Sequence, residues 1–270
     1  MRKVLTIAGS DSGGGAGIQA DLKTFQELGV YGMSALTAVT SQNTLGVQAV
    51  YPLPSEATAR QLQSIGDDMG TDAVKTGMLF DAEIIQTVAG SIKSYGWKNV
   101  VVDPVMIAKG GTSLLQKEAI TALKEELLPL AMVVTPNIPE AEELAGMAIK
   151  TEEEKKEAAR ILHGLGAPYV VMKGGHDEDK DQAVDILFDG EDFFHFTSPR
   201  ILTKNTHGTG CTFSAAIAAE LAKGHSVYDA VSTAKQFIQA AIEDAIQVGN
   251  GHGPTNHWAF QRKNQLAGKR

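Results

Sequence analysis

The sequence predicts an α/β fold in which a mainly parallel central sheet carries helices on both faces. Short apolar runs alternate along the chain with segments whose apolar residues recur at helical spacing, such as Ile18, Leu22 and Phe25. Strands separated by helices imply right-handed crossovers and a sheet that is buried on both sides. Because no linker, repeat or low-complexity stretch interrupts this alternation, we predict a single domain over residues 1–270.

Six apolar runs are predicted as strands of this sheet. Each is short, rich in β-branched and small apolar residues, and bounded by residues that favour turns. The runs are VLTIA (4–8), SALTAV (34–39), DAVKT (72–76), NVVVDPV (99–105), AMVVTPN (131–137) and YVVMKGG (169–175).

A short β-hairpin is predicted at residues 183–196, after the alternating part of the chain. Two β-like runs there flank Asp189 and Gly190, a dipeptide typical of a two-residue turn. The sequence that follows predicts two long helices, from about residue 210 to residue 246. The element order is therefore α/β, then a β-ribbon, then helices.

Composition excludes several classes of function. The chain has 24 basic and 32 acidic residues and a net charge of −8, without a dense Lys/Arg run, which argues against nucleic acid as a partner. It lacks the run of about 18 apolar residues that a membrane span needs, and its N-terminus reaches glycines too early for a signal peptide. With one cysteine, no intrachain disulfide forms. We therefore expect a cytoplasmic protein.

The first glycine-rich loop, AGSDSGGGAGIQAD (8–21), joins the first strand to the first helix, where α/β sheets bind ligands. Gly13, Gly15 and Gly17 give the spacing G-x-G-x-G, whereas the dinucleotide fingerprint needs G-x-G-x-x-G. The P-loop pattern of common NTPases is absent from the chain. The alternative is that these glycines only form a tight turn and allow close helix packing.

The second glycine loop, NTHGTGCTFSAA (205–216), leads into a helix of small residues. Successive backbone amides and the positive helix end converge there, which predicts a phosphate site. Cys211, the only cysteine, falls in the first turn, where the helix dipole is expected to lower a thiol pKa. The alternative is a small buried residue that packs under the helix.

Six motifs, in order along essentially the whole chain, resemble the hydroxymethylpyrimidine/phosphomethylpyrimidine kinases of thiamin biosynthesis. This family belongs to the ribokinase-like superfamily. The resemblance implies a three-layer α/β fold, two successive phosphoryl transfers from ATP with Mg²⁺ to a small aminopyrimidine alcohol and its phosphate, and a homodimer. The motifs are AGSDSGGGAGIQADLKTF (8–25), KTGML (75–79), VVDPVM (101–106), TPNIPEAEEL (135–144), MKGGH (172–176) and NTHGTGCTFSAA (205–216).

The resemblance assigns the phosphoryl-transfer step to the second glycine loop. The amides of Gly208, Thr209 and Gly210 are expected to hold the transferring phosphate, and Cys211 to deprotonate the attacking hydroxymethyl group. Because phosphoryl-transfer transition states are loose, positioning and charge neutralisation matter more than a strong base. A purely positional role for Cys211 therefore stays open.

On the nucleotide side, the resemblance implies that Asn137, Lys173 and Thr206 bind ATP, and that Glu140 and Asp103 serve Mg²⁺. A single carboxylate is reasonable because Mg²⁺ keeps several waters. The alternatives are structural. Asn137 could only cap a short helix, Lys173 could be a solvated charge at a strand end, and Asp103 could only make a turn with the following proline.

Gln42 is expected to select the substrate. A 4-aminopyrimidine shows an amino donor beside a ring-nitrogen acceptor, and a glutamine amide carries the reciprocal pair. The stretch SQNTLGV (41–47) resembles the form found in the pyrimidine kinases. Under the same resemblance, Asp21, Met78 and Val105 line the substrate pocket.

Two other functions compete with the leading one. A pyridoxine or pyridoxal kinase acts on a similar flat ring with a hydroxymethyl group, and Gln42 is the feature that separates the two. A catalytically silent protein that only binds a pyrimidine or nucleotide would have lost Cys211, a loop glycine or Glu140, and the sequence retains all of them.

Two further stretches are candidate sites. Residues 106–115, with Lys109 and hinge glycines Gly110 and Gly111, form a candidate lid. His252 and His257 invite a metal interpretation, but they have no third ligand nearby and lie in a Gly/Pro loop, so we expect no metal there.

Overall fold

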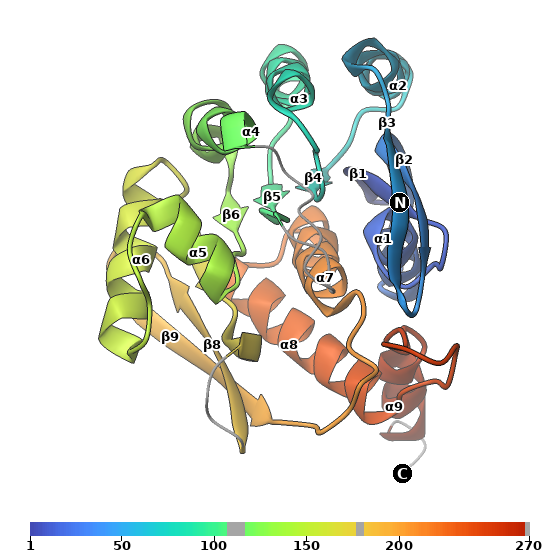
Figure 1. Ribbon diagram of the computed structural model, residues 1–270, viewed down its shortest axis with the longest axis vertical. Helices are drawn as coiled ribbons and strands as arrows, with labels where there is room; N and C mark the ends of the chain where they lie inside the picture. The colour runs from blue at the N-terminus through green and yellow to red at the C-terminus, as the bar shows by residue number, and fades with distance from the viewer. Residues whose placement is uncertain (107–116, 177–180, 268–270) are drawn as a thin grey trace.

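The computed structural model describes residues 1–106, 117–176 and 181–267. These residues form a fold built around a central β-sheet of nine strands (Figure 1). The strand order is β3-β2-β1-β4-β5-β6-β7-β8-β9. The strands are β1 Lys3–Asp11, β2 Tyr31–Asn43, β3 Gly46–Pro52, β4 Ala73–Thr76, β5 Val100–Val102, β6 Val133–Val134, β7 Tyr169–Met172, β8 Gln182–Phe188 and β9 Phe193–Pro199.

Strands β2, β1, β4, β5, β6 and β7 lie next to one another in this order and pair in parallel. At one edge β3 pairs antiparallel with β2, and at the other β8 pairs antiparallel with both β7 and β9. The predicted mainly parallel sheet and the predicted hairpin, β8–β9, are both confirmed. β3 was not predicted. It pairs with the long β2 after a turn at Asn43–Gly46, where Gly46 adopts a φ of 143°.

The fold has three layers, with the sheet between two layers of helices (Figure 1). One helical layer holds α1, α7 and α8, and the opposite layer holds α2 to α6. The helices are α1 Gly17–Glu27, α2 Ser55–Asp68, α3 Ala82–Tyr95, α4 Lys117–Ala122, α5 Ile138–Ala145, α6 Glu152–Gly164, α7 Thr209–Lys223, α8 Val227–Glu243 and α9 Ala259–Ala267, with a π-helical turn at Leu123–Leu127 and 3₁₀ turns at Leu128–Leu130 and Gly174–His176.

Each face of the sheet has its own hydrophobic core, as burial on both sides requires. On one face Phe25, Phe213 and Phe237 pack among small residues of α7 and α8. On the other face the core includes Ile84 of α3 and Leu127 of the π turn. The predicted pair of long helices is confirmed, with a break at Gly224, which caps α7 in the left-handed conformation.

This arrangement places the functional loops together. The carboxyl ends of parallel strands meet at one edge of a sheet, and α7 packs against β1, β4 and β5 with its N-terminus at that edge. Within the described part of the chain, no helix is both long and apolar enough to cross a membrane.

Candidate active site

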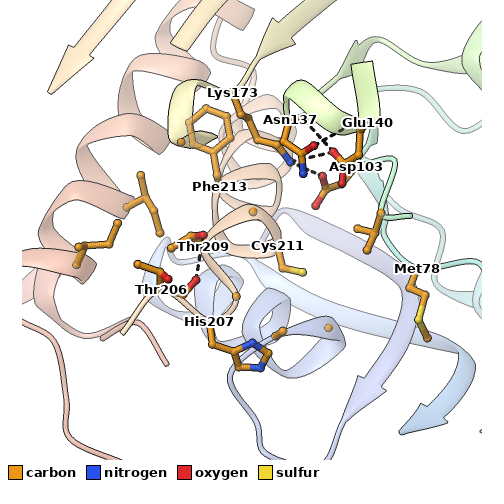
Figure 2. A pocket seen from close by; sticks show the side chains of 18 of the residues that line it. Met78, Asp103, Asn137, Glu140, Lys173, Thr206, His207, Thr209, Cys211 and Phe213 are labelled. Carbon is orange, nitrogen blue, oxygen red and sulfur yellow. Dashed lines mark hydrogen bonds and ion pairs between the residues drawn. The ribbon is translucent and has the colours of Figure 1, made fainter. Parts of the chain in front are cut away.

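A pocket of about 720 Å³ lies at the carboxyl ends of the parallel strands. Its wall combines the two glycine loops, the N-terminus of α7, the ends of β4 and β5, and the start of α5 (Figure 2). Twelve of the thirteen residues that the sequence assigned to the site line it: Gln42, Met78, Asp103, Val105, Asn137, Glu140, Lys173, Thr206, Gly208, Thr209, Gly210 and Cys211.

The two glycine loops touch each other at Gly208. This residue is the N-cap of α7 and has a φ of 80°, and a Cβ atom there would lie 1.8 Å from the carbonyl oxygen of Gly15. Only glycine fits such a position. The first amides of α7 have no partner inside the helix, and Thr209 and Gly210 line the pocket. The Thr209 amide makes only a long bond of 3.4 Å to the Thr206 carbonyl, so this helix end can bind an anion.

Cys211 lies in the first turn of α7, and Figure 2 shows its thiol on the side that faces Met78. Burial raises the pKa of Cys211 to about 11, although the nearby Lys75 ammonium acts in the opposite direction. The expectation of a lowered pKa is therefore wrong, because desolvation outweighs the favourable charges. The thiol is protonated at neutral pH.

A second charged group, Lys173 with Asp103 and Glu140, faces the same pocket (Figure 2). Lys173 Nζ lies 2.8 Å from Asp103 Oδ1 and 3.7 Å from Glu140 Oε2. Burial would lower the pKa of Lys173, but the two carboxylates outweigh it and keep the ammonium charged. Lys173 is only 13% exposed, so the alternative of a solvated strand-end charge does not describe it.

Asn137 and Glu140 form a reciprocal capping box at the start of α5. The Glu140 amide donates to Asn137 Oδ1 at 2.9 Å, and the Asn137 amide donates to Glu140 Oε2 at 2.8 Å. The structural interpretation of Asn137 as a helix cap is therefore confirmed, and both residues also line the pocket. Burial raises the pKa of Glu140 to about 7, with Lys173 opposing this.

Asp103 accepts hydrogen bonds through both carboxylate oxygens. Oδ1 receives Lys173 Nζ and, at 3.3 Å, the Thr135 hydroxyl, and Oδ2 receives the Ser214 hydroxyl at 3.1 Å. Direct metal coordination would have to displace these donors. Asp103 therefore fits the role of an anchor for Lys173 better than that of a Mg²⁺ ligand.

Asp21 is the one predicted site residue that does not line the pocket. Its side chain is fully buried behind Lys75, where Oδ2 accepts from Lys75 Nζ at 2.9 Å and from Thr6 Oγ1 at 2.6 Å. The expected position is wrong because α1 packs this carboxylate against Thr6 of β1 and Lys75 of β4, inside the sheet. Asp21 instead holds Lys75, which does line the pocket.

Lys75 belongs to the KTGML motif, but the sequence predicted no role for it. It is 0% exposed, and burial alone would lower its pKa. The Asp21 and Asp103 carboxylates raise that pKa above the usual value and keep the ammonium charged. A lysine at the end of an otherwise apolar strand is the signal that could have identified it.

The part of the pocket beside α8 was also missed. Phe213, Ile238 and Ile242 contribute apolar walls, and Lys235 bridges Asp185 Oδ2 at 2.8 Å and the Ala183 carbonyl at 2.9 Å. Ile238 and Ile242 come from α8, one helical turn apart, so their spacing indicates only a buried helix face.

The remaining predictions concern a lid and a metal. The candidate lid at residues 106–115, with Lys109, Gly110 and Gly111, lies outside the described residues apart from Met106, which lines the pocket. His252 and His257 do not meet at a metal site. His257 is buried beside Thr212 Oγ1, 3.0 Å away, while His252 is exposed. The described residues hold no group of three or more metal-ligating side chains.

Comparisons with known proteins point to one family. The family model described as phosphomethylpyrimidine kinase matches residues 11–256. A hydroxymethylpyrimidine/phosphomethylpyrimidine kinase of Bacillus subtilis is 55% identical over 260 residues, which is 96% of this chain and 96% of the relative.

Proteins named for vitamin B6 are also similar. A pyridoxine kinase of Bacillus subtilis is 50% identical over 268 residues, covering 98% of this chain and 99% of the relative. The solved ADP complex of Bacillus subtilis pyridoxal kinase matches with a TM-score of 0.90 and 49% identity, and the match covers 97% of this chain and 99% of that one. These similarities show the ribokinase-like kinase fold.

Proposed function

Because this chain belongs to the phosphomethylpyrimidine kinase family, we propose that it transfers the γ-phosphoryl group of ATP to 4-amino-5-hydroxymethyl-2-methylpyrimidine and then phosphorylates the monophosphate. One observation carries the choice of substrate. The amide of Gln42 lines the same pocket as Cys211 and the N-terminus of α7. The Gln42 amide thus offers one hydrogen-bond donor and one acceptor to the amino group and ring nitrogen of an aminopyrimidine, in the same pocket where the hydroxymethyl group would react.

In the proposed first step, the hydroxymethyl oxygen attacks the γ-phosphorus and the bond to the β–γ bridging oxygen breaks, releasing ADP. The amides of Thr209 and Gly210, with the Gly208 turn, hold the transferring group. The ammonium groups of Lys75 and Lys173 offset its charge. Because the transition state is loose, no strong base is required.

Cys211 orients the attacking hydroxyl in this proposal. A thiol that is protonated at neutral pH cannot take a proton first, so the hydroxyl hydrogen passes to an oxygen of the transferred phosphate. This revises the expected proton-accepting role in favour of the positional one.

ATP is proposed to extend from the α7 N-terminus toward the part of the pocket beside α8. Lys173 and Asn137 lie beside the second glycine loop (205–216), here called the anion loop, and Thr206 lies within it, so all three would meet the phosphates. Phe213 and Ile238 offer the apolar surface that a flat base needs.

Mg²⁺ is proposed to arrive with the nucleotide, and Glu140 fits it best among the described carboxylates. Mg²⁺ is held by one or two carboxylates together with phosphates and waters, and it neutralises phosphate charge. Glu140 lines the pocket and uses Oε2 for its cap and for Lys173, while Oε1 enters no recorded hydrogen bond of the described residues.

We also propose a homodimer, as the family resemblance implies, and we propose that it acts in the cytoplasm. Exposed apolar side chains at the β2–β3 edge of the sheet, Val39 at 40% and Tyr51 at 60% exposure, support an association surface. Sedimentation velocity tests it: the mass of two chains is expected, and a monomer at micromolar concentration would contradict it.

A pyridoxal or pyridoxine kinase is the second candidate, favoured by the 50% identical relative of that name. The two candidate functions are distinguished by mass spectrometry of the products when the hydroxymethylpyrimidine, its monophosphate and pyridoxal are each incubated separately with ATP and Mg²⁺. Pyrimidine monophosphate and diphosphate with little pyridoxal phosphate is the expected result. Strong pyridoxal phosphorylation would make the pyridoxal kinase the leading candidate. No product in any reaction would favour a protein that only binds a pyrimidine or nucleotide.

A further inference from the structure

Three side chains from distant parts of the chain meet at the part of the pocket that Gln42 lines. Asp11 ends β1, Gln42 lies near the end of β2, and His207 precedes α7. His207 Nε2 lies 2.8 Å from Asp11 Oδ2 and 3.3 Å from Gln42 Nε2, and all three residues line the pocket. The residue expected to select the substrate therefore touches the anion loop.

Asp11 determines which ring nitrogen of His207 carries hydrogen. Its carboxylate also accepts from the amides of Gly13, Gly15 and Ala16 at 2.8 to 2.9 Å. Burial would raise the pKa of Asp11, but the hydrogen bonds from His207 and the amides outweigh it and hold the pKa below its usual value. An ionised carboxylate only accepts, so Nε2 of His207 must donate to it.

The hydrogen on His207 Nε2 in turn limits how the Gln42 amide can lie. An amide nitrogen also only donates, so two donors would face each other across 3.3 Å. A half-turn of the amide brings Oε1 to the ring instead, where it shares the one Nε2 hydrogen with Asp11 Oδ2, and brings Nε2 to Thr40 Oγ1, which lies 3.1 Å from the other end of the amide. Thr40 can accept there, because its own hydrogen is directed at the Ser10 carbonyl, 2.8 Å away.

We propose that His207 is a positioning residue for substrate choice, holding the Gln42 amide with Oε1 toward its ring and Nε2 toward Thr40. An amide oxygen accepts two hydrogen bonds and an amide nitrogen donates two. One acceptor site and one hydrogen of Gln42 then remain for the amino group and ring nitrogen of the aminopyrimidine. The inference rests on the proposed function.

The imidazole has little freedom to abandon this arrangement. A Cβ atom on Gly15 would lie 2.5 Å from His207 Cδ2 and 3.0 Å from Pro254 Cβ, so the ring is confined between the first glycine loop and the C-terminal segment. The His207 amide is also fixed, because it donates to the Gly253 carbonyl at 3.1 Å. A confined donor can orient a neighbouring amide at small entropic cost.

The test is calorimetric binding of two ligands to the wild type, His207→Phe and His207→Gln. The ligands are 4-amino-5-hydroxymethyl-2-methylpyrimidine and its analogue without the 4-amino group. Phenylalanine keeps a flat ring without the donor, and glutamine offers a donor at similar reach. We expect His207→Phe to weaken the aminopyrimidine about tenfold, as loss of one oriented hydrogen bond does, and His207→Gln to stay within about threefold of the wild type.

The analogue is expected to change by less than about twofold, because it lacks the group that Gln42 accepts from. The inference would be overturned if His207→Phe weakened binding of both ligands equally, or if it did not weaken binding of the aminopyrimidine. It would also be overturned if His207→Gln weakened aminopyrimidine binding as much as His207→Phe does. Binding of a nonhydrolysable ATP analogue, expected to be the same in all three proteins, controls for the anion loop. A wild type that does not bind the aminopyrimidine at all would instead refute the proposed function.

Discussion

Cys211 is the only cysteine of the chain, and its position in the first turn of α7 does not make it a reactive thiol. Burial raises its pKa to about 11, so we expect slow alkylation by iodoacetamide at neutral pH and a rate that climbs steadily with pH. Mass spectrometry of labelling across pH 7 to about 10 measures this. Urea-unfolded protein is the matched control, since it exposes the same thiol. Faster labelling of the folded than of the unfolded chain at neutral pH would contradict the account.

Lys75 and Asp21 form a fully buried ion pair, with 0% exposure of both side chains. Removing one partner of such a pair leaves an uncompensated charge, so Lys75→Met should lower the free energy of unfolding by roughly 3–5 kcal/mol. The double variant Lys75→Met/Asp21→Asn, which removes both charges, should regain much of that loss. Denaturant unfolding of the three proteins measures it, and a double variant no more stable than Lys75→Met would show that the charge is not the cause.

At the scale of elements, the start of α5 couples a helix cap to the nucleotide side of the site. Asn137→Ala should cost about 1 kcal/mol of stability and also raise the KM for ATP, because Glu140 loses its tether beside Lys173. Thr151→Ala is the matched control. Thr151 and Glu154 form the same capping box on α6, away from the pocket. If both variants raise the KM equally, the coupling does not exist.

Elements with strong local signals could be predicted from the sequence, and those set by distant contacts could not. The six apolar runs became β1, β2, β4, β5, β6 and β7 because their apolar character reflects burial on both faces. β3 was missed because a half-exposed edge strand lacks that signal.

The site followed the same division. Glycine loops and motif residues were placed in the pocket because the carboxyl ends of parallel strands converge. The contact of His207 with Gln42 spans 165 positions, and the burial of Asp21 depends on how α1 packs. No spacing in the sequence encodes either of these contacts. The Cys211 pKa was predicted in the wrong direction because burial depth is a tertiary property.

For the whole molecule, the C-terminal segment is tied to α7 by buried His257, which lies 3.0 Å from Thr212 Oγ1. Burial, and secondarily Lys23, lowers the pKa of His257 to about 4. The unfolded chain therefore binds more protons than the folded one below the unperturbed pKa of about 6.5. Stability should be full above that pH and fall toward pH 4, by on the order of 3 kcal/mol from this group.

Denaturant unfolding at a series of pH values measures this loss, with His257→Gln as the control. Glutamine does not titrate, so its stability should change less over the same interval. Equal slopes for the two proteins would contradict the assignment. The same curves bear on the proposed single domain, 1–270, for which we expect one cooperative transition.

The central claim is that this pocket prefers an aminopyrimidine alcohol as phosphoryl acceptor, and a competition assay tests it most directly. Equimolar 4-amino-5-hydroxymethyl-2-methylpyrimidine and pyridoxal share limiting ATP and Mg²⁺ in one reaction, so the product ratio equals the ratio of the two kcat/KM values. Because Gln42 matches only the aminopyrimidine edge, we predict that pyrimidine phosphate exceeds pyridoxal phosphate by about tenfold or more. A mixture in which pyridoxal phosphate predominates would contradict the account.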